Sequence, residues 1–171
     1  MKVADDPPWM AEARRHIGTR EIPGPKHQPK ILRWWEKIRA GFRDDETPWC
    51  AAFVGGCLEE VGIRSTRSGM ARSYSRSEHF RKLSKPAHGC IVVFWRGSPT
   101  GATGHVAFLD GLRGGDVWCL GGNQGDAVSL ARFSTGRLVG YYWPAATALD
   151  PTFFPARLYS GTGGVYSTNE A

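Results

Sequence analysis

The chain has 171 residues and a mass of 18.8 kDa, which is the usual size of one domain and enough to bury a substantial core. Hydrophobic residues make up 41% and charged residues 22%, and no apolar run approaches the roughly 18 residues needed to cross a bilayer. We therefore expect a soluble globular protein that does not insert into membranes. The formal net charge of +6 favours an anionic partner, such as nucleic acid, a membrane surface or an acidic envelope polymer.

The N-terminal segment and the cysteine spacing bear on cellular location. Residues 1–10 carry two acidic residues and two prolines where a Sec-type signal would need an apolar stretch, so we expect synthesis in the cytoplasm without a signal peptide. The chain has neither a CxxC pair nor the cysteine density of a disulfide scaffold, which favours reduced thiols. The four cysteines are Cys50, Cys57, Cys90 and Cys119.

Two helices are expected in the first quarter of the chain. The first follows a pair of prolines and stops at Gly18, and the second begins at Pro29 and ends at Gly41. Both carry apolar residues at helical spacing, which gives each helix one buried face. The apolar residues are Trp9, Met10, Ala13 and Ile17 in the first helix and Ile31, Leu32, Trp34, Trp35 and Ile38 in the second.

The third helix has the clearest boundary signals. Thr47 is a natural N-cap, Pro48 suits the first helical position, and Gly62 supplies a C-terminal stop. A weaker helical pattern follows over residues 71–83.

From residue 90 the pattern changes to short β-rich runs bounded by Gly, Asp and Ser, which predicts a meander of about five strands. Helices first and strands second indicate an α+β fold with an antiparallel sheet. We therefore predict one domain over residues 1–144 and a loosely packed tail without a motif over residues 145–171. The predicted strands are Cys90 to Trp95, His105 to Leu109, Val117 to Leu120, Ala127 to Phe133 and Leu138 to Trp143.

Cys50 is the candidate nucleophile, because the capping signals put it at the third position of the third helix. There the free backbone N–H groups and the helix dipole favour a thiolate, and the same groups can stabilise an oxyanion. The alternative is that Cys50 is a small buried hydrophobic residue, which is the interpretation that we give to the other three cysteines.

A thiolate nucleophile needs a general base, and His105 is the candidate because it follows Gly104 and opens an apolar strand. A structural histidine at a strand edge is an equally good interpretation of this position. The other four lie in polar surroundings or connectors and are expected to be solvated; they are His16, His27, His79 and His88.

A third polar group is needed to orient the imidazole. Asn123 and Gln124 lie in the Gly-rich turn over residues 121–125, where either side chain would be held close to the backbone. The alternative is an ordinary hairpin turn, for which Gly and Asn are common choices.

Metal and phosphate chemistry find little support. The sequence has no HxxxH, HExxH or CxxC motif, so we expect no metal site, and its GxG-like stretches lack a βα context. Seven tryptophans and a pI near 9.4 are the only support for a different class, a basic nucleic-acid binder.

Four motifs, in this order, resemble the NlpC/P60 and CHAP-related group of papain-like cell-wall hydrolases. They are TPWCAAFV at 47–54, GHVAF at 104–108, GGNQ at 121–124 and GYYWP at 140–144. The similarity extends from about Trp9 to Pro144 and is strongest to small single-domain versions from phage endolysins. It implies a papain-like α+β core with the cysteine at the start of a central helix packed on the sheet.

The resemblance also implies the site. The nucleophile of the family falls on Cys50, its histidine on His105, and its variable third member on Asn123, with Gln124 as the alternative. Trp49 and Trp95 are expected to line the substrate groove. Asp45 is a weaker candidate for setting the local hydrogen bonding.

By this resemblance the chain hydrolyses an amide bond of peptidoglycan, without a cofactor or metal, as a monomer that does not bind nucleic acid. The setting expected is a phage-type endolysin, released to the wall in the periplasm through a holin-like or other export route. Anionic envelope polymers are possible further partners. The alternatives are a secreted antibacterial effector of the same chemistry and an inactive wall-binding module.

Overall fold

The computed structural model describes residues 6–154 and 156–159. Within this part of the chain, three α-helices precede a six-stranded sheet, and three short 3-10 helices connect the elements. The α-helices are α1 (Pro8–Arg14), α2 (Pro29–Ile38) and α3 (Cys50–Glu60); the strands are β1 (Phe80–Leu83), β2 (Ile91–Trp95), β3 (Gly104–Arg113), β4 (Asp116–Gly121), β5 (Ser129–Phe133) and β6 (Leu138–Pro144); the 3-10 helices are η1 (Ala71–Ser75), η2 (Thr135–Arg137) and η3 (Pro151–Phe153).

The sheet is antiparallel throughout, with the strand order β1-β6-β2-β3-β4-β5. The predicted α+β class is confirmed. The predicted five-strand meander is correct only for β2 to β5, because β6 returns to pair with β2. The sequence pattern also missed β1, which lies in the segment predicted as a helix over residues 71–83. In β1 only Phe80 and Leu83 are buried, and this three-residue spacing is that of a helix rather than the alternation of a strand.

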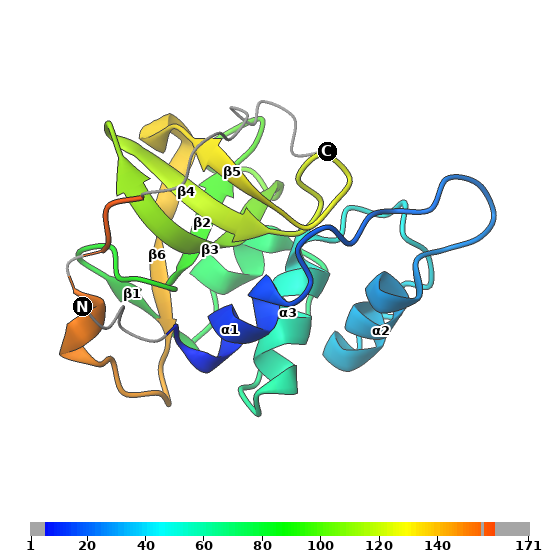
Figure 1. The fold of residues 1–171 in the computed structure, drawn as a ribbon, viewed down its shortest axis with the longest axis horizontal. Coiled ribbons are helices and arrows are strands. Elements are labelled where there is room, and N and C mark those ends of the chain that lie inside the picture. The colour runs from blue at the N-terminus through cyan, green and yellow to red at the C-terminus, as the bar shows by residue number, and fades with distance from the viewer. Residues whose placement is uncertain (1–5, 155, 160–171) are drawn as a thin grey trace.

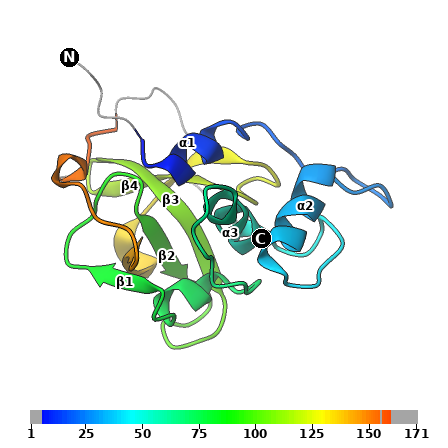
Figure 2. The same ribbon diagram turned by 90° about the horizontal axis from the view of Figure 1, so that it is seen from below.

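The helices form a layer on one side of the sheet, and α3 is its centre. In both views of the ribbon, α3 lies between the sheet and α2 (Figures 1 and 2). α1 contacts α3 and β4. Residues 50–58 of α3 are all buried, and each large apolar side chain among them contributes roughly 2 kcal/mol by leaving water.

One glycine sets the approach of α2 to α3. A Cβ atom built on Gly56 would lie 2.5 Å from Cδ1 of Trp34, far inside van der Waals contact. The indole of Trp34 therefore packs directly on the α3 backbone, and its ring also stacks on Trp49 at a centroid distance of 5.8 Å. The hydrophobic contact between these helices fixes the position of the N-terminus of α3.

The start of α3 differs from the prediction. The helix begins at Cys50, with Trp49 as N-cap and without a side-chain cap, rather than at Pro48. Asp44 accounts for the difference, because its carboxylate accepts the backbone N–H of Thr47 at 2.6 Å and the hydroxyl of Thr47 at 3.1 Å. The hydroxyl that was expected to cap the helix is thus engaged in a preceding turn.

The described part of the C-terminal segment packs against the sheet, more closely than predicted. Tyr159 is buried and stacks on Trp118 with ring centroids 4.1 Å apart, and Leu158 forms a bridge to Leu112. Residue 155 and residues 160–171 of the predicted tail lie outside the described residues. Over the part of the chain that the structure describes, no helix combines the length and the apolar character needed to cross a membrane.

Candidate active site

Cys50 is the first residue of α3 and its side chain is almost covered, with 5% of the residue exposed. The first helical hydrogen bond runs from the Phe53 N–H to the Trp49 carbonyl at 3.0 Å. The N–H groups of the residues before Phe53 therefore have no partner within the helix. The sequence placed Cys50 two positions further into the helix, but both positions lie in the first turn, where the helix dipole favours an anion.

His105 is the second residue of β3 and is completely buried. It pairs in register with Phe94 of β2, and its ring stacks on Phe133 with a centroid distance of 5.3 Å. Its side chain is close enough to Cys50 to lower the pKa of the thiol. The structure therefore brings together the two residues that the sequence singled out, although they are 55 positions apart.

Gln124 provides the third polar group. Its Oε1 lies 3.0 Å from Nε2 of His105, while its amide nitrogen donates to the carbonyl of Ser129 at 2.7 Å and to that of Cys119 at 3.3 Å. Because these two carbonyls can only accept, the amide oxygen must face the imidazole. Nε2 of His105 is then the N–H donor, and the nitrogen remaining for Cys50 is Nδ1.

Asn123, the first choice from the sequence, is the residue before Gln124. It is buried and adopts a left-handed backbone conformation, with φ at 58°. Asn tolerates this conformation well, so its presence in the motif is explained by the turn. Gly121 leaves room for the side chain of Gln124, the alternative candidate, because a Cβ atom at position 121 would lie 2.3 Å from Oε1 of Gln124. The geometry therefore assigns the third position to Gln124.

The surroundings of Cys50 favour its thiolate. Burial by itself would raise the pKa of Cys50, but the hydrogen bond and charge of His105, with smaller contributions from the Val106 backbone and Arg96, bring the pKa below its ordinary value of 9.0. Burial raises the pKa of Cys57 well above that value and the pKa of Cys90 to about 12. Cys50 thus differs from both in having an electropositive partner. Sequence reasoning missed Arg96, which follows β2 and carries no motif of its own.

Trp49 and Asp45 support the site from within the protein. The ring of Trp49 is fully buried, and its Nε1 donates to Oε1 of Glu21 at 2.7 Å. Asp45 is also fully buried, and its carboxylate accepts the backbone N–H groups of Ile22 and Gln28 at 2.8 and 2.9 Å. Neither side chain faces a surface where substrate could contact it. Their place is instead in holding the connector before α2 against the start of α3.

Trp95 remains a candidate for substrate contact. It is half-buried at the end of β2 and pairs in register with Gly104, the residue before His105. Since successive side chains of a strand point to opposite faces, its ring leaves the sheet on the face opposite to that of Phe94 and His105. Across residues 6–154 and 156–159, no group of three His, Cys, Asp or Glu residues could hold a metal ion.

Comparison with known proteins agrees with this arrangement. Residues 42–123 match the CHAP domain family, and this segment contains both Cys50 and His105. No curated protein matches the chain. A solved structure that resembles it is a protein of the NLP/P60 family from Staphylococcus aureus subsp. aureus Mu50, described as similar to lipoprotein. The identity is 16% and the TM-score 0.45, over 79% of this chain and 39% of that one.

Residues 42–123 are therefore similar to a CHAP domain, one of the two families that the motifs indicated. This is a family of peptidoglycan hydrolases, and CHAP domains are typically cysteine- and histidine-dependent amidases or peptidases. The CHAP match ends at Asn123, one residue before the side chain that contacts His105.

Proposed function

We propose that this chain hydrolyses an amide bond of peptidoglycan, with Cys50 as nucleophile, His105 as acid and base, and Gln124 as the residue that orients the imidazole. The observation that carries the proposal is the position of the His105 ring, between the Cys50 thiol and the amide oxygen of Gln124. A neutral amide fixes the tautomer and leaves the imidazole free to change its charge.

In the first half of the reaction, the Cys50 thiolate attacks the carbonyl carbon of the scissile amide. The resulting oxyanion is stabilised by free backbone N–H groups in the first turn of α3. The C–N bond then breaks, and protonated His105 transfers its Nδ1 proton to the departing amine. The product of this half is a thioester on Cys50 and a free amine.

In the second half, neutral His105 accepts a proton from water through Nδ1, and the oxygen of that water attacks the thioester carbonyl. The C–S bond breaks, a carboxylic acid leaves, and Cys50 returns to a thiolate paired with the imidazolium. Stacking on Phe133 and the bond to Gln124 keep the ring in place through both proton transfers.

The setting that we propose is a phage-type endolysin that reaches the wall in the periplasm by a holin-like or other release route. The support for it is the resemblance of the four motifs to small single-domain endolysins. A holin gene beside the coding sequence is expected, whereas an adjacent immunity gene would favour a secreted effector.

Lysis of permeabilised bacteria tests the chemistry. Cys50→Ser and His105→Ala should lose turbidity clearance by at least about 1,000-fold, because each removes a group that forms or breaks bonds. Circular dichroism must show that both variants remain folded. Full lysis by either folded variant would contradict the proposal, and mass spectrometry of the muropeptides released by the unaltered protein would identify the bond that is cut.

Thiol alkylation tests the nucleophile without a substrate. Because the pKa of Cys50 is lowered and that of Cys90 is about 12, iodoacetamide near pH 7 should modify Cys50 first and abolish activity in parallel. Peptide mapping by mass spectrometry gives the site of modification. Earlier or equal labelling of a different cysteine would mean that Cys50 is not the activated thiol.

A further inference from the structure

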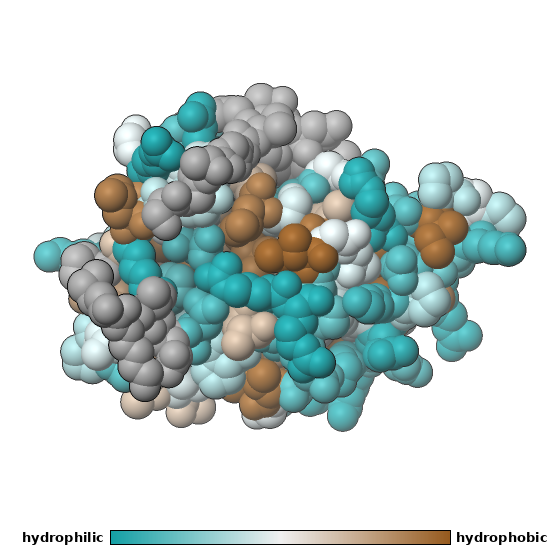
Figure 3. Space-filling model, in the orientation of Figure 1, coloured by the Kyte–Doolittle hydropathy of each residue, from teal (hydrophilic) through white to brown (hydrophobic). Residues whose placement is uncertain are grey.

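The positive charge of the chain is concentrated in one part of the molecule. Residues 26–43 contain six Lys and Arg residues and one acidic residue, a net charge of +5 against +6 for the whole chain. This segment includes α2, which lies at the edge of the molecule beyond α3 (Figures 1 and 2). The surface on that side is mostly hydrophilic in the space-filling view (Figure 3). This segment thus carries most of the net charge at one edge of the molecule.

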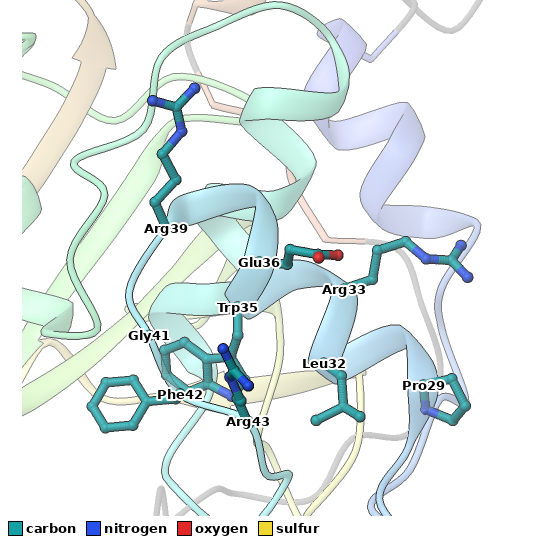
Figure 4. Close-up of a pocket in the computed structure, with 9 residues that line it drawn as sticks. All are labelled: Pro29, Leu32, Arg33, Trp35, Glu36, Arg39, Gly41, Phe42 and Arg43. Atoms are coloured by element: carbon teal, nitrogen blue, oxygen red, sulfur yellow. The ribbon is translucent and has the colours of Figure 1, made fainter.

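A cavity of about 710 Å³ lies along this element (Figure 4). Its lining combines three arginines, Arg33, Arg39 and Arg43, with apolar and aromatic side chains from α2 and the segment that follows it. Phe42 is 43% exposed and packs on Trp35, with ring centroids 4.7 Å apart. The cavity therefore offers an aromatic surface beside several positive charges.

The three guanidinium groups have no carboxylate partner among the described residues. All three arginines are exposed, and the neighbouring Lys37 already forms an ion pair with Glu60. Figure 4 shows the side chains of Arg33 and Arg39 pointing away from each other, with Glu36 between them. Exposed guanidinium groups of this kind can bind anionic groups at separate points of a long ligand.

The cavity is also connected to the active site. Trp35 donates from Nε1 to the carbonyl of Asp44 at 2.9 Å, and the Asp44 carboxylate holds the turn at Thr47, three residues before Cys50. Neither Cys50 nor His105 lines the cavity. A long polymer could thus be held at α2 while another part of it reaches the cysteine.

We propose that this cavity is a second binding site for peptidoglycan, in which stem-peptide carboxylates bind the three arginines and a sugar ring packs on Phe42. The inference rests on the proposed function, since it assumes that the wall is the substrate. It assigns the cavity to holding the polymer, separately from the cleavage site at Cys50.

The lining favours this occupant over a polymer of phosphate groups. Glu36 belongs to the lining and would repel a densely charged polyanion, whereas stem peptides carry both carboxylates and amino or amide groups. Leu32 and Pro29 add apolar surface, which a simple polyol phosphate chain does not use.

Binding to purified sacculi tests the proposal in the full-length protein with Cys50→Ala, which prevents cleavage during the measurement. The double variant Arg33→Gln/Arg43→Gln should bind about tenfold more weakly in a sedimentation assay, from two ion pairs that are partly shielded from water. Arg39 is left unchanged because it adopts a left-handed conformation, with φ at 57°. The matched control Arg64→Gln/Arg81→Gln removes two exposed arginines elsewhere and should bind normally.

A separate variant tests the aromatic part of the cavity. Phe42→Leu keeps an apolar side chain but removes the flat ring, and it should weaken sacculus binding by a few fold with an unchanged unfolding midpoint. With Cys50 intact, the Arg33→Gln/Arg43→Gln protein should cleave a soluble disaccharide-peptide at the normal rate while acting more slowly on sacculi.

Three other outcomes would overturn the proposal. Normal sacculus binding by the double variant would exclude the site, and an equal loss of activity on the soluble fragment would place these arginines in the cleavage groove. If binding were lost only when phosphate polymers are stripped from the sacculi, the ligand of the cavity would be a phosphate polymer and not the stem peptide. Specific binding without any cleavage by the unaltered protein would instead count against the proposed function alone.

Discussion

Two buried histidines in this protein have partners of different charge. His105 and His88 are 0% and 1% exposed, and each has a side-chain oxygen at its Nε2. For His105 that oxygen belongs to the amide of Gln124 at 3.0 Å, and for His88 it belongs to the carboxylate of Asp6 at 2.6 Å. His105 also lowers the pKa of the Cys50 thiol.

The difference is that His105 contacts a neutral amide, whereas His88 belongs to an ionic network. Asp6 also binds Arg14 at 2.6 Å, and Arg14 binds Asp110 of β3, so the network ties the N-terminal segment to the sheet. Three charged side chains around His88 hold one arrangement. Around His105 the Gln124 amide is neutral, so in the proposed mechanism the Cys50 thiolate balances the imidazolium, which loses its charge when the thiolate reacts.

Removing the Gln124 amide is the strongest test of this difference between the two histidines. Gln124→Ala should lower kcat/KM on a soluble muropeptide by about 10- to 100-fold, since the imidazole loses the acceptor that fixes its tautomer. Asn123→Gly, which keeps the left-handed turn, should stay within a few fold of normal. If the Asn123 variant lost more activity than the Gln124 variant, the assignment of the third residue would be reversed.

Removing the carboxylate beside His88 should affect stability and leave catalysis unchanged. Asp6→Asn is expected to reduce the free energy of unfolding by about 2 kcal/mol at pH 7, because it weakens hydrogen bonds to both His88 and Arg14. Urea denaturation gives the stability change, and kcat/KM should be unaltered. A loss of activity in the folded variant would show that this network also serves the active site.

The same variant has a defined pH dependence. Burial opposes the ionisation of Asp6, but the hydrogen bonds from His88 and Arg14 outweigh it and hold the pKa of Asp6 well below its ordinary 3.8. A lowered pKa in the folded state stabilises the protein above the unfolded value, and this contribution is lost as the pH falls below it. The stability gap between the normal protein and Asp6→Asn should therefore narrow below pH 3.8. A stability difference that does not change with pH would show that the ionisation of Asp6 is not its cause.

The smallest expected effect concerns the charge around the Cys50–His105 pair. The pKa of Cys50 is lowered mainly by His105 against the opposing effect of burial, and Arg96 adds a weaker contribution. Activity should therefore rise with pH through a midpoint below 9.0, and Arg96→Gln should move that midpoint upward by a few tenths of a unit. Arg64→Gln, which removes a distant exposed charge, should leave the profile in place.

The sequence predicted the elements that depend on local signals. The helix starts at Pro8 and Pro29 follow from proline at the first turn, and most strands follow from β-rich runs between turn residues. It was wrong where a distant partner decides the structure. β1 exists because β6 pairs with it, and His88, expected in solvent, is buried against a carboxylate 82 residues away.

By itself, the sequence singled out Cys50 as the candidate nucleophile and indicated which family the chain resembles, because the helix start around Cys50 and the order of four motifs are local, linear properties. Only the tertiary structure decided how the side chains pair. It placed Nε2 of His105 against Oε1 of Gln124, since two carbonyls orient that amide. Hydrogen-bond geometry between distant segments carries that information, and no spacing along the chain encodes it.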